Sequence, residues 1–382
     1  MFSAVVPFCI VTLIALAPSQ DPQTPISLHN EAAQILALPP LEQDLIRLIQ
    51  LDLSLSDETD AGSLQTSRKI LRSLAVSQDA TAMEHVRSVF ENEPERRGVA
   101  AWALSQSTAL RPADLQDWRS MVRSLTVVSG DDAVSVVHAL QRFRIRANKP
   151  HWVRQVILAG LTMTPEQQPA AVTLLKHWTG VPGADTEWTL ADYQAWFVKE
   201  HADQPAAVLP TDALDRKWNF ANLQAEIQNL QTTTELYAAG EAAYIKAGCQ
   251  KCHRRGQTGD AFGPDLTSLG WRRQRQEILQ AILFPSHELN EEFPLVSVEL
   301  KDGRTLSGIL SGGQAAEQMI LVSNRATREE FSRADVVQIV NQKTSNMPEG
   351  TLEILTLDEI RGLFAYLTSI DGVPKPHGDE LE

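Results

Sequence analysis

The sequence predicts a multidomain, mainly α-helical chain that contains one small β-rich module. Three observations lead to this fold class. Apolar residues recur at three- and four-residue spacing from about residue 28 to residue 200, short strand patterns appear only after residue 293, and a helical pattern returns from Thr356. At 382 residues the chain is long enough to build two or three separate hydrophobic cores.

Eight segments of the first region carry the helical pattern, and short breaks containing Pro, Gly, Asp or Ser separate them. They span residues 41–54, 64–77, 82–93, 97–107, 118–128, 133–143, 151–161 and 168–178. Helices of this length joined by short turns are expected to pair as antiparallel hairpins. Residues 28–205 are therefore expected to form an α-helical domain that resembles HEAT-type repeats, with a plain helical bundle as the alternative. Residues 206–239 are expected to form a linker and a further helix.

The β-rich module is predicted over residues 294–341. "LVSVEL" and "TLSGILSGG" lie on either side of an Asp-Gly turn, and "QMILVSN" and "VVQIVNQ" give two more strand patterns. Four or five short strands in one segment indicate a small barrel of the SH3 or Sm type. After the module, Thr356 followed by an acidic first turn predicts the start of a last helix.

The N-terminal residues indicate export. Residues 4–17 form an uncharged apolar run that is shorter than the ~20 residues needed to span a bilayer, and small residues follow it. Residues 1–19 are therefore predicted to be a signal peptide, which implies a periplasmic or otherwise exported protein with no integral membrane span after cleavage. No Lys or Arg precedes the run, so an uncleaved anchor is the alternative. Cys9 lies inside this segment and would be lost with it.

The mature chain would then keep only Cys249 and Cys252, in the motif Cys-Gln-Lys-Cys-His. This spacing lets both thiols bond to one haem, with His253 beneath the iron as an axial ligand. A zinc site would need a second pair of ligands at matching spacing, and no further cysteine supplies one. A redox disulfide remains the alternative, although such a pair usually begins a helix and here a helical pattern precedes it. The motif therefore predicts one covalently bound haem c.

A second axial ligand is expected from a methionine. Only Met319 and Met347 follow His253 in the sequence. Met319 falls in a strand pattern, where a core role is the better interpretation. Met347 lies in the loop "TSNMPEG" before the last helix and is the predicted ligand.

The order "GEAAYIKAGCQKCH", "FGPDLTSLG", "NMPEG" and "LTLDEIRGLFAYL" resembles a class I cytochrome c. More narrowly, residues 240–372 are similar to a haem-binding domain found in Planctomycetes and Verrucomicrobia, in which a strand-rich insertion separates the haem motif from the methionine loop. Residues 294–341 account for 48 of the 94 positions from His253 to Met347, which agrees with such an insertion. Residues 373–382 would be a C-terminal tail.

The resemblance implies roles for seven residues. Cys249 and Cys252 would hold the haem, and His253 and Met347 would bind its iron. The Pro264 carbonyl would accept a hydrogen bond from the second ring nitrogen of His253. Tyr244 and Tyr366 would lie on facing terminal helices near the haem, with plain helix packing as the alternative for both.

Two filled axial positions predict outer-sphere electron transfer with a redox partner protein, and an electron carrier rather than an enzyme. One alternative is a peroxidase-like haem enzyme or sensor in which Met347 is displaced and His287 is a rival ligand. Another is a scaffold whose helical region binds other proteins and carries the haem as an appendage.

Charge gives further expectations about partners. The net charge of −14 argues against nucleic-acid binding. A local excess of basic residues around the cysteine motif favours an acidic redox partner, with an ordinary solvated surface as the alternative. These residues are Lys246, Lys251, Arg254, Arg255, Arg272, Arg273 and Arg275, against Asp260 and Asp265. Four other histidines are interpreted as surface or packing residues, namely His85, His138, His151 and His177.

Overall fold

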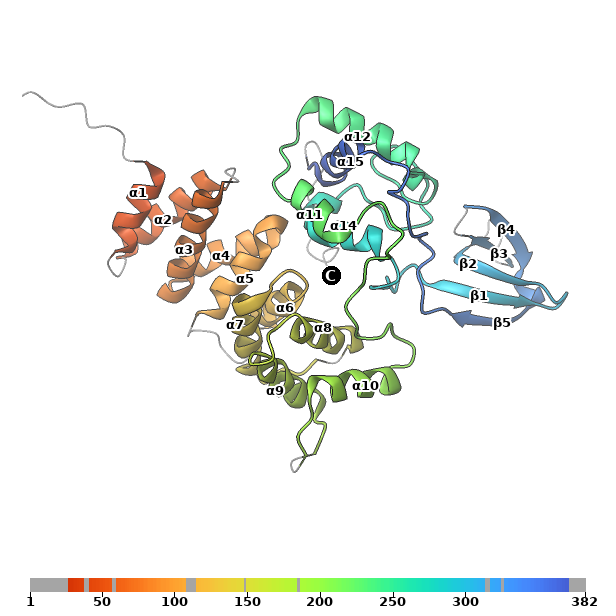
Figure 1. Ribbon diagram of the computed structural model, residues 1–382, viewed down its shortest axis with the longest axis horizontal. Helices are drawn as coiled ribbons and strands as arrows, with labels where there is room; N and C mark the ends of the chain where they lie inside the picture. The colour runs from red at the N-terminus through yellow and green to blue at the C-terminus, as the bar shows by residue number, and fades with distance from the viewer. Residues whose placement is uncertain are drawn as a thin grey trace, which may run out of the picture.

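The computed structural model describes residues 27–37, 41–56, 60–107, 115–147, 149–183, 186–312, 317–323 and 326–370. These residues form an N-terminal helical body, a second helical body and one small sheet, each with its own hydrophobic core (Figure 1). The predicted class, mainly α with one β-rich module, is confirmed. The predicted signal peptide, residues 1–19, and the predicted tail, residues 373–382, lie outside the described residues.

The N-terminal body contains the first ten α-helices, and all eight predicted helical segments are helical in it. Their apolar stripes meet in one core that runs from Ala32 to Ala207. The helices are α1 (Leu28–Leu36), α2 (Glu42–Leu55), α3 (Ala61–Ser77), α4 (Ala80–Asn92), α5 (Arg97–Ser105), α6 (Leu115–Ser124), α7 (Gly130–Gln141), α8 (Pro150–Leu161), α9 (Gln168–Thr179) and α10 (Leu190–Glu200), with the short 3₁₀ turn η1 (Pro94–Arg96) before α5.

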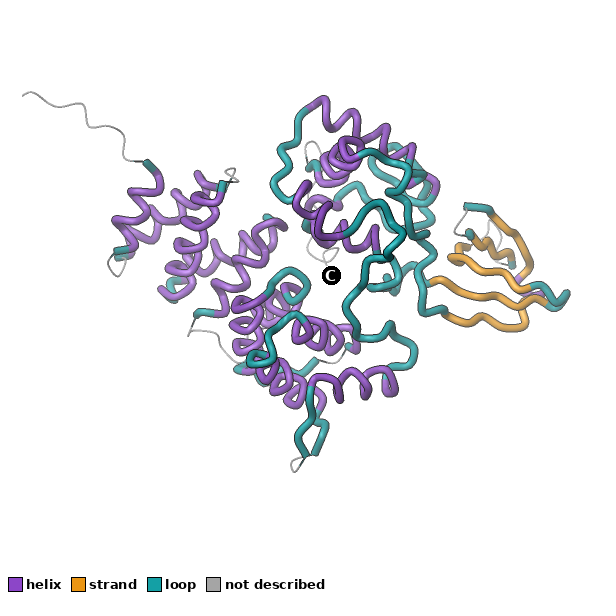
Figure 2. Tube along the Cα trace, in the orientation of Figure 1, coloured by secondary structure: helices purple, strands orange, loops and turns teal. Residues whose placement is uncertain are grey.

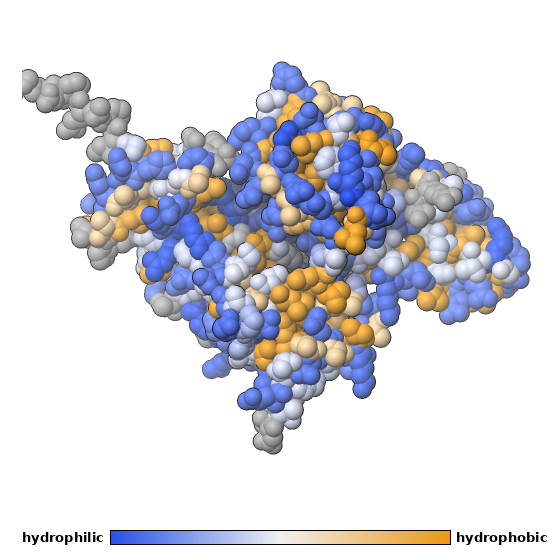
Figure 3. All heavy atoms as spheres, in the orientation of Figure 1, coloured by the Kyte–Doolittle hydropathy of each residue, from blue (hydrophilic) through white to orange (hydrophobic). Residues whose placement is uncertain are grey.

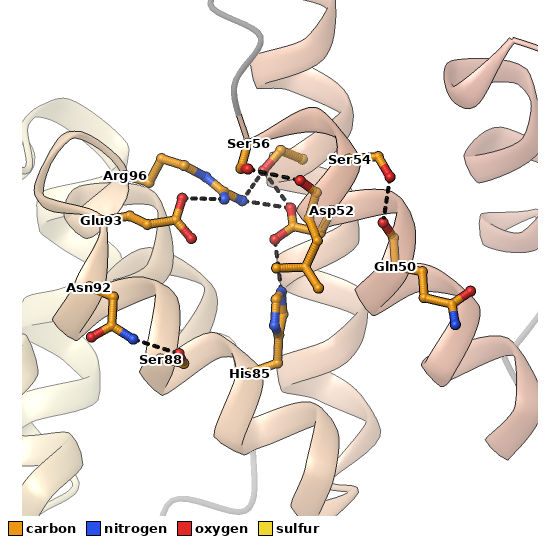
Figure 4. A network of polar contacts seen from close by, with 11 residues as sticks. Gln50, Asp52, Ser54, Ser56, His85, Ser88, Asn92, Glu93 and Arg96 are labelled. Atoms are coloured by element: carbon orange, nitrogen blue, oxygen red, sulfur yellow. Dashed lines mark hydrogen bonds and ion pairs between the residues drawn. The ribbon is translucent and has the colours of Figure 1, made fainter. Parts of the chain in front are cut away.

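A buried polar network joins α2 to its neighbours (Figure 4). The Asp52 carboxylate is fully buried and accepts hydrogen bonds from Arg96 Nη2 (2.6 Å) and Ser67 Oγ (2.8 Å). His85 Nε2 lies 2.8 Å from its other oxygen. Burial alone would raise the pKa of Asp52, but the His85 hydrogen bond and the Arg96 charge hold that pKa below its usual value. His85 and Ser67 each bind a different oxygen of Asp52 and not one another. His85 therefore does not act as a base on the Ser67 hydroxyl, and the network is structural.

The second helical body contains α11 (Phe220–Ile227), α12 (Thr234–Lys246), the 3₁₀ turn η2 (Cys249–Lys251), α13 (Leu269–Arg272), α14 (Arg275–Leu283) and α15 (Leu357–Thr368). Its core joins Tyr244 and Phe364 to Leu223 and Ile227, so the core begins earlier in the chain than residue 240. Thr356 caps α15 as predicted, because its side chain accepts the Glu359 backbone N–H and the Glu359 side chain binds back to Thr356.

Helices α12 and α15 cross at two glycines. A Cβ atom on Gly240 would lie 2.6 Å from the Gly362 carbonyl carbon and equally close to the Cβ of Tyr366, and it would meet the Gly362 carbonyl oxygen as well. Only glycine fits at this position, because any side chain would push the two helices apart.

The sheet is antiparallel and has the strand order β4-β3-β2-β1-β5, as labelled in Figure 1. Figure 2 shows its strands in orange, beside the purple helices. Its strands are β1 (Leu295–Leu300), β2 (Thr305–Gly312), β3 (Gln318–Val322), β4 (Arg328–Ser332) and β5 (Val336–Asn341), with η3 (Arg333–Asp335) between the last two. Met319 is buried in its core, in agreement with the packing role that the sequence predicts. Within the described residues no pairing joins β4 to β5, so the strands form an open sheet where a barrel was expected.

The two helical bodies meet through the start of α14 and the loop before it. Arg97 Nη1 donates to the Arg272 carbonyl (3.0 Å), and the Arg275 backbone N–H donates to Glu95 Oε1 (3.0 Å). Arg97 also lies 3.7 Å from Glu277. Among the residues described, no helix has the length and apolar character needed to cross a membrane.

Candidate cofactor site around Cys249, Cys252 and His253

The end of α12 folds Cys249, Cys252 and His253 into one tight turn. Gly248 follows the helix with a φ of +81°, a left-handed conformation that costs glycine little, and the chain then enters η2. The Cys249 carbonyl accepts the backbone N–H groups of Cys252 (3.1 Å) and His253 (2.9 Å). Both thiols and the imidazole therefore project from a single, internally bonded turn.

Both cysteines are free thiols and are partly buried. Burial raises the pKa of the Cys249 thiol to about 11, and burial also raises the pKa of Cys252. Redox-active and metal-binding cysteines depend on a lowered pKa that favours the thiolate. The turn therefore presents neutral thiols, which is the opposite of what a dithiol redox centre requires.

His253 is held in one orientation by the loop that follows it. Its Nδ1 lies 2.9 Å from the Pro264 carbonyl oxygen, and since a carbonyl only accepts, Nδ1 carries the proton and donates. The other ring nitrogen, Nε2, then keeps its lone pair. Burial lowers the pKa of His253 despite the opposing effect of the Pro264 hydrogen bond. The imidazole is therefore neutral near pH 7, which is the form that binds a metal ion.

The loop after His253 wraps closely around the imidazole. The backbone N–H groups of Phe262 and Gly263 donate to the Cys252 carbonyl at 3.0 and 2.7 Å. A Cβ on Gly263 would lie 2.8 Å from His253 Cε1, and Gly259, with a φ of +103°, packs against the His253 carbonyl. Neither glycine was expected to form part of the site, although "GDAFGPD" places both within five residues before Pro264.

Two aromatic residues connect the turn to the helix crossing. Tyr244 of α12 donates its hydroxyl to the His253 carbonyl oxygen at 2.6 Å. The rings of Tyr244 and Tyr366 lie 5.5 Å apart, and both side chains are buried. Burial raises the pKa of both phenols, so they stay protonated and Tyr244 remains a donor. Both residues thus lie on facing helices next to the His253 backbone.

Arg255 is a buried cation in this site, not a surface charge as expected. It is only 5% exposed, and its guanidinium carbon lies 4.1 Å from the centre of the Tyr366 ring. Arg255 Nη1 donates to the Tyr237 hydroxyl (3.1 Å) and Nη2 donates to the Ser369 carbonyl (2.9 Å). A count of basic residues in the sequence cannot reveal this burial.

Met347 lies on a separate turn between β5 and α15. Its backbone N–H donates to Ser345 Oγ (3.1 Å), and the Ser345 N–H donates to Ser286 Oγ (3.1 Å). The buried Asn346 donates to the Val322 carbonyl at the end of β3 (3.2 Å). Met347 itself is partly buried. The sheet therefore anchors this turn, while the other six predicted site residues lie together around the cysteine motif.

The sheet also contacts the loop after His253. The Arg328 guanidinium of β4 lies 4.4 Å from the centre of the Phe262 ring and 3.5 Å from Asp260. The sheet therefore contacts the loop that follows His253 as well as the turn that carries Met347.

The predicted basic surface is dispersed in the structure. Lys246 pairs with Glu359 (2.7 Å), Arg254 with Asp265 (2.6 Å) and Arg273 with Glu277 (3.0 Å). Arg272 and Arg275 take part in contacts between the bodies or with backbone carbonyls, namely those of Asp265, Gln228 and Leu230. Lys251 is exposed. The seven basic residues therefore do not form one free patch.

His287, the rival ligand considered from the sequence, contacts the N-terminal body and not the cysteine turn. Its Nδ1 is 3.4 Å from Arg154 Nη2 in the N-terminal body. Within the described part of the chain, no cluster of three or more His, Cys, Asp or Glu side chains is arranged to hold a metal ion.

No protein-family model matches this sequence, and no curated protein matches it.

Proposed function

We propose that this protein is an exported c-type cytochrome with one covalently bound haem, ligated by His253 and Met347, that transfers electrons without binding a substrate at iron. The observation that carries the proposal is the turn that presents two neutral thiols and an imidazole with a free Nε2, oriented by the Pro264 carbonyl. This donor set fits thioether attachment and axial ligation together.

The residues of this turn have separate tasks. Cys249 and Cys252 would each add S–H across one vinyl group, which needs thiols that are free rather than joined in a disulfide. His253 offers Nε2, while its Nδ1 hydrogen bond fixes the plane of the ring and raises its basicity. A bound haem supplies a one-electron couple between ferric and ferrous iron.

Met347 would complete the axial pair. Support comes from the two serine hydrogen bonds and the Asn346 contact that define its turn. The thioether of methionine favours ferrous iron and so raises the reduction potential.

We infer that residues 240–372 form a cytochrome c-like domain whose crossing helices are α12 and α15, with residues 294–341 as an inserted SH3- or Sm-like module. The HEAT-like helical region is proposed to bind partner proteins. The electron partner is proposed to be an acidic redox protein, because Lys251 is exposed beside the motif, whereas Arg254 is exposed there but paired with Asp265.

The test is the visible spectrum of oxidised protein made with a haem-attachment system. The wild-type protein is expected to show the iron–methionine charge-transfer band, and Met347→Ala is expected to lose it. Met319→Ala is the matched control, since Met319 is buried in the sheet core, and it should keep the band. A wild-type spectrum of open, high-spin iron would reject electron transfer as the function and favour the haem enzyme or sensor.

A further inference from the structure

A cavity of about 330 Å³ lies between the two helical bodies, away from the cysteine turn. Helices α8 and α10 and the linker after α10 form one wall, and Ser286, His287 and Lys343 form the other. Its size is at the lower end of the range found for small-molecule sites, and such sites often lie where domains meet.

Arg154 of α8 places a buried positive charge in this cavity. The residue is 6% exposed. Its Nε donates to the carbonyls of Pro205 and Ala206 (both 3.1 Å), and its Nη2 donates to Ala206 as well. Nη2 also lies 3.4 Å from His287 Nδ1 across the cavity. Among the described residues, Arg154 has no carboxylate within ion-pair distance, and its Nη1 makes no hydrogen bond there but is not an enclosed donor. Burial lowers its pKa, with Glu288 only partly opposing this effect. A buried and unpaired cation is costly unless an anion joins it.

The opposite wall adds groups that suit an anion. Lys343 is exposed at the mouth of the cavity and forms no ion pair with any residue in the described ranges. Ser286 Oγ accepts the Ser345 N–H and keeps its own proton to donate. His287 is neutral, because burial and then the Arg154 charge lower its pKa to about 4.

Except for Gln204, the rest of the lining is apolar. It comprises Val198, Ala202, Pro205, Ala206 and Val208. Val198 and Val208 are each more than half exposed, at 52% and 53%. Figure 3 shows apolar side chains gathered over α8 and towards α10 on this face of the molecule. An inorganic anion would leave this apolar surface uncovered, whereas an organic anion would cover it.

We propose that this interdomain cavity binds a small organic carboxylate, with the carboxylate on Arg154 and Lys343 and its apolar body against Val198 and Val208. The site stands independently of the proposed function. It supplies the ion partner that Arg154 lacks and joins the two helical bodies through one ligand.

The same cavity is connected to the turn of Met347. Ser286 in its wall accepts the Ser345 N–H, and Ser345 Oγ accepts the Met347 N–H. The bound carboxylate therefore also controls how firmly Met347 is held, and this second part rests on the proposed haem ligation. A change in how firmly the Met347 thioether is held would alter the reduction potential of the haem.

Calorimetric titration of the full chain with benzoate tests the site, with benzamide as the neutral probe and sulfate as the inorganic one. Benzoate is expected to bind with a Kd of about 1 mM or below, and benzamide and sulfate to bind at least about tenfold more weakly. Arg154→Gln should weaken benzoate binding by at least about tenfold. No benzoate binding up to about 10 mM, or equal binding of benzamide, would overturn the site.

Arg154 also supports the linker through its carbonyl contacts, so a second variant is needed. Lys343→Gln is exposed and should leave the fold intact while weakening benzoate binding about two- to fivefold. Lys301→Gln, an exposed lysine in the β1–β2 turn, is the matched control and should bind benzoate like the wild type. Equal benzoate affinity in all three variants would place the binding elsewhere and reject the assignment.

The link to Met347 has its own readout. Benzoate at a concentration close to the wild-type Kd should shift the reduction potential of the haem-loaded wild-type protein. The shift should be smaller in Lys343→Gln at the same concentration, in proportion to its lower occupancy. An unchanged potential with normal benzoate binding would reject the link and keep the site. Benzoate binding by protein without haem would keep the site even if the cytochrome proposal failed.

Discussion

The crossing of α12 and α15 gives the sharpest prediction about stability. In Gly240→Ala the new Cβ would lie 2.6 Å from both the Gly362 carbonyl carbon and the Tyr366 Cβ. Ordinary contacts between carbon atoms are about 3.5 to 4.0 Å, so the helices must separate by roughly 1 Å. Overpacking of this kind costs about 1–3 kcal/mol. The cost should lie in the upper part of this range, because the obstructing atoms belong to the backbone and cannot rotate away.

Alanine also improves helix propensity, by about 1 kcal/mol at most relative to glycine. The clash should exceed this gain, so the net loss in the free energy of unfolding should be about 1–2 kcal/mol. Gly362→Ala is the matched variant, because its nearest atom is Gly240 N at 3.0 Å and a small adjustment suffices. Its net change should be within about 1 kcal/mol of zero.

Hydrogen exchange measured on α12 and α15 reports on this body separately from the N-terminal helices. Gly240→Ala should lower the protection of both helices, Gly362→Ala should lower it less, and Gly183→Ala, where a Cβ meets nothing within 4 Å, should leave it unchanged. Wild-type protection of both helices in Gly240→Ala would refute the close crossing.

Three further predictions concern other parts of the chain. The pKa of His287, lowered from 6.5 to about 4, means that the unfolded chain takes up this proton first as the pH falls. The free energy of unfolding should therefore decrease between pH 6.5 and 4, by about 2 kcal/mol because solvent screens this partly exposed imidazole, and His287→Gln should lose this part of the pH dependence in denaturant titrations. Asp52→Asn removes the buried carboxylate that binds Arg96 and His85, so that Arg96 keeps only the partly exposed Glu93, and it should destabilise the N-terminal body by about 3 kcal/mol in thermal unfolding. A loss no larger than that of Arg47→Gln, which breaks the more exposed pair of Arg47 with Glu31, would contradict this network. Tyr244→Phe removes the donor to the His253 carbonyl and should cost about 1 kcal/mol by the same method, and no change would show that the bond contributes nothing.

The sequence was sufficient for elements that depend on local patterns. Apolar spacing predicted the eight helices, the Asp-Gly turn predicted the β1–β2 hairpin, and Thr356 with Glu359 predicted the start of α15. The turn of Cys249 and His253 also follows from neighbours in the chain, since its hydrogen bonds span only a few residues.

Contacts between distant segments could not be predicted in the same way. Arg275 binds Glu95 from 180 residues away, so its place in the interface depends on how the two bodies pack. Arg255 was expected at the surface because its charge is visible in the sequence, whereas the ring of Tyr366 that covers it belongs to the last helix. The open sheet differs from the expected barrel for a related reason, because strand patterns predict strands and not whether the first and last edges meet.

The proposed function depends on covalent attachment of haem to Cys249 and Cys252, and a pyridine haemochrome spectrum of protein exported with a haem-attachment system tests this attachment. The wild-type protein should give the spectrum of haem with two saturated vinyl groups and keep its colour after acid–acetone extraction. The variant with Cys249→Ser and Cys252→Ser should lose both properties. A colourless wild-type protein, or haem that acid–acetone removes completely, would contradict covalent attachment.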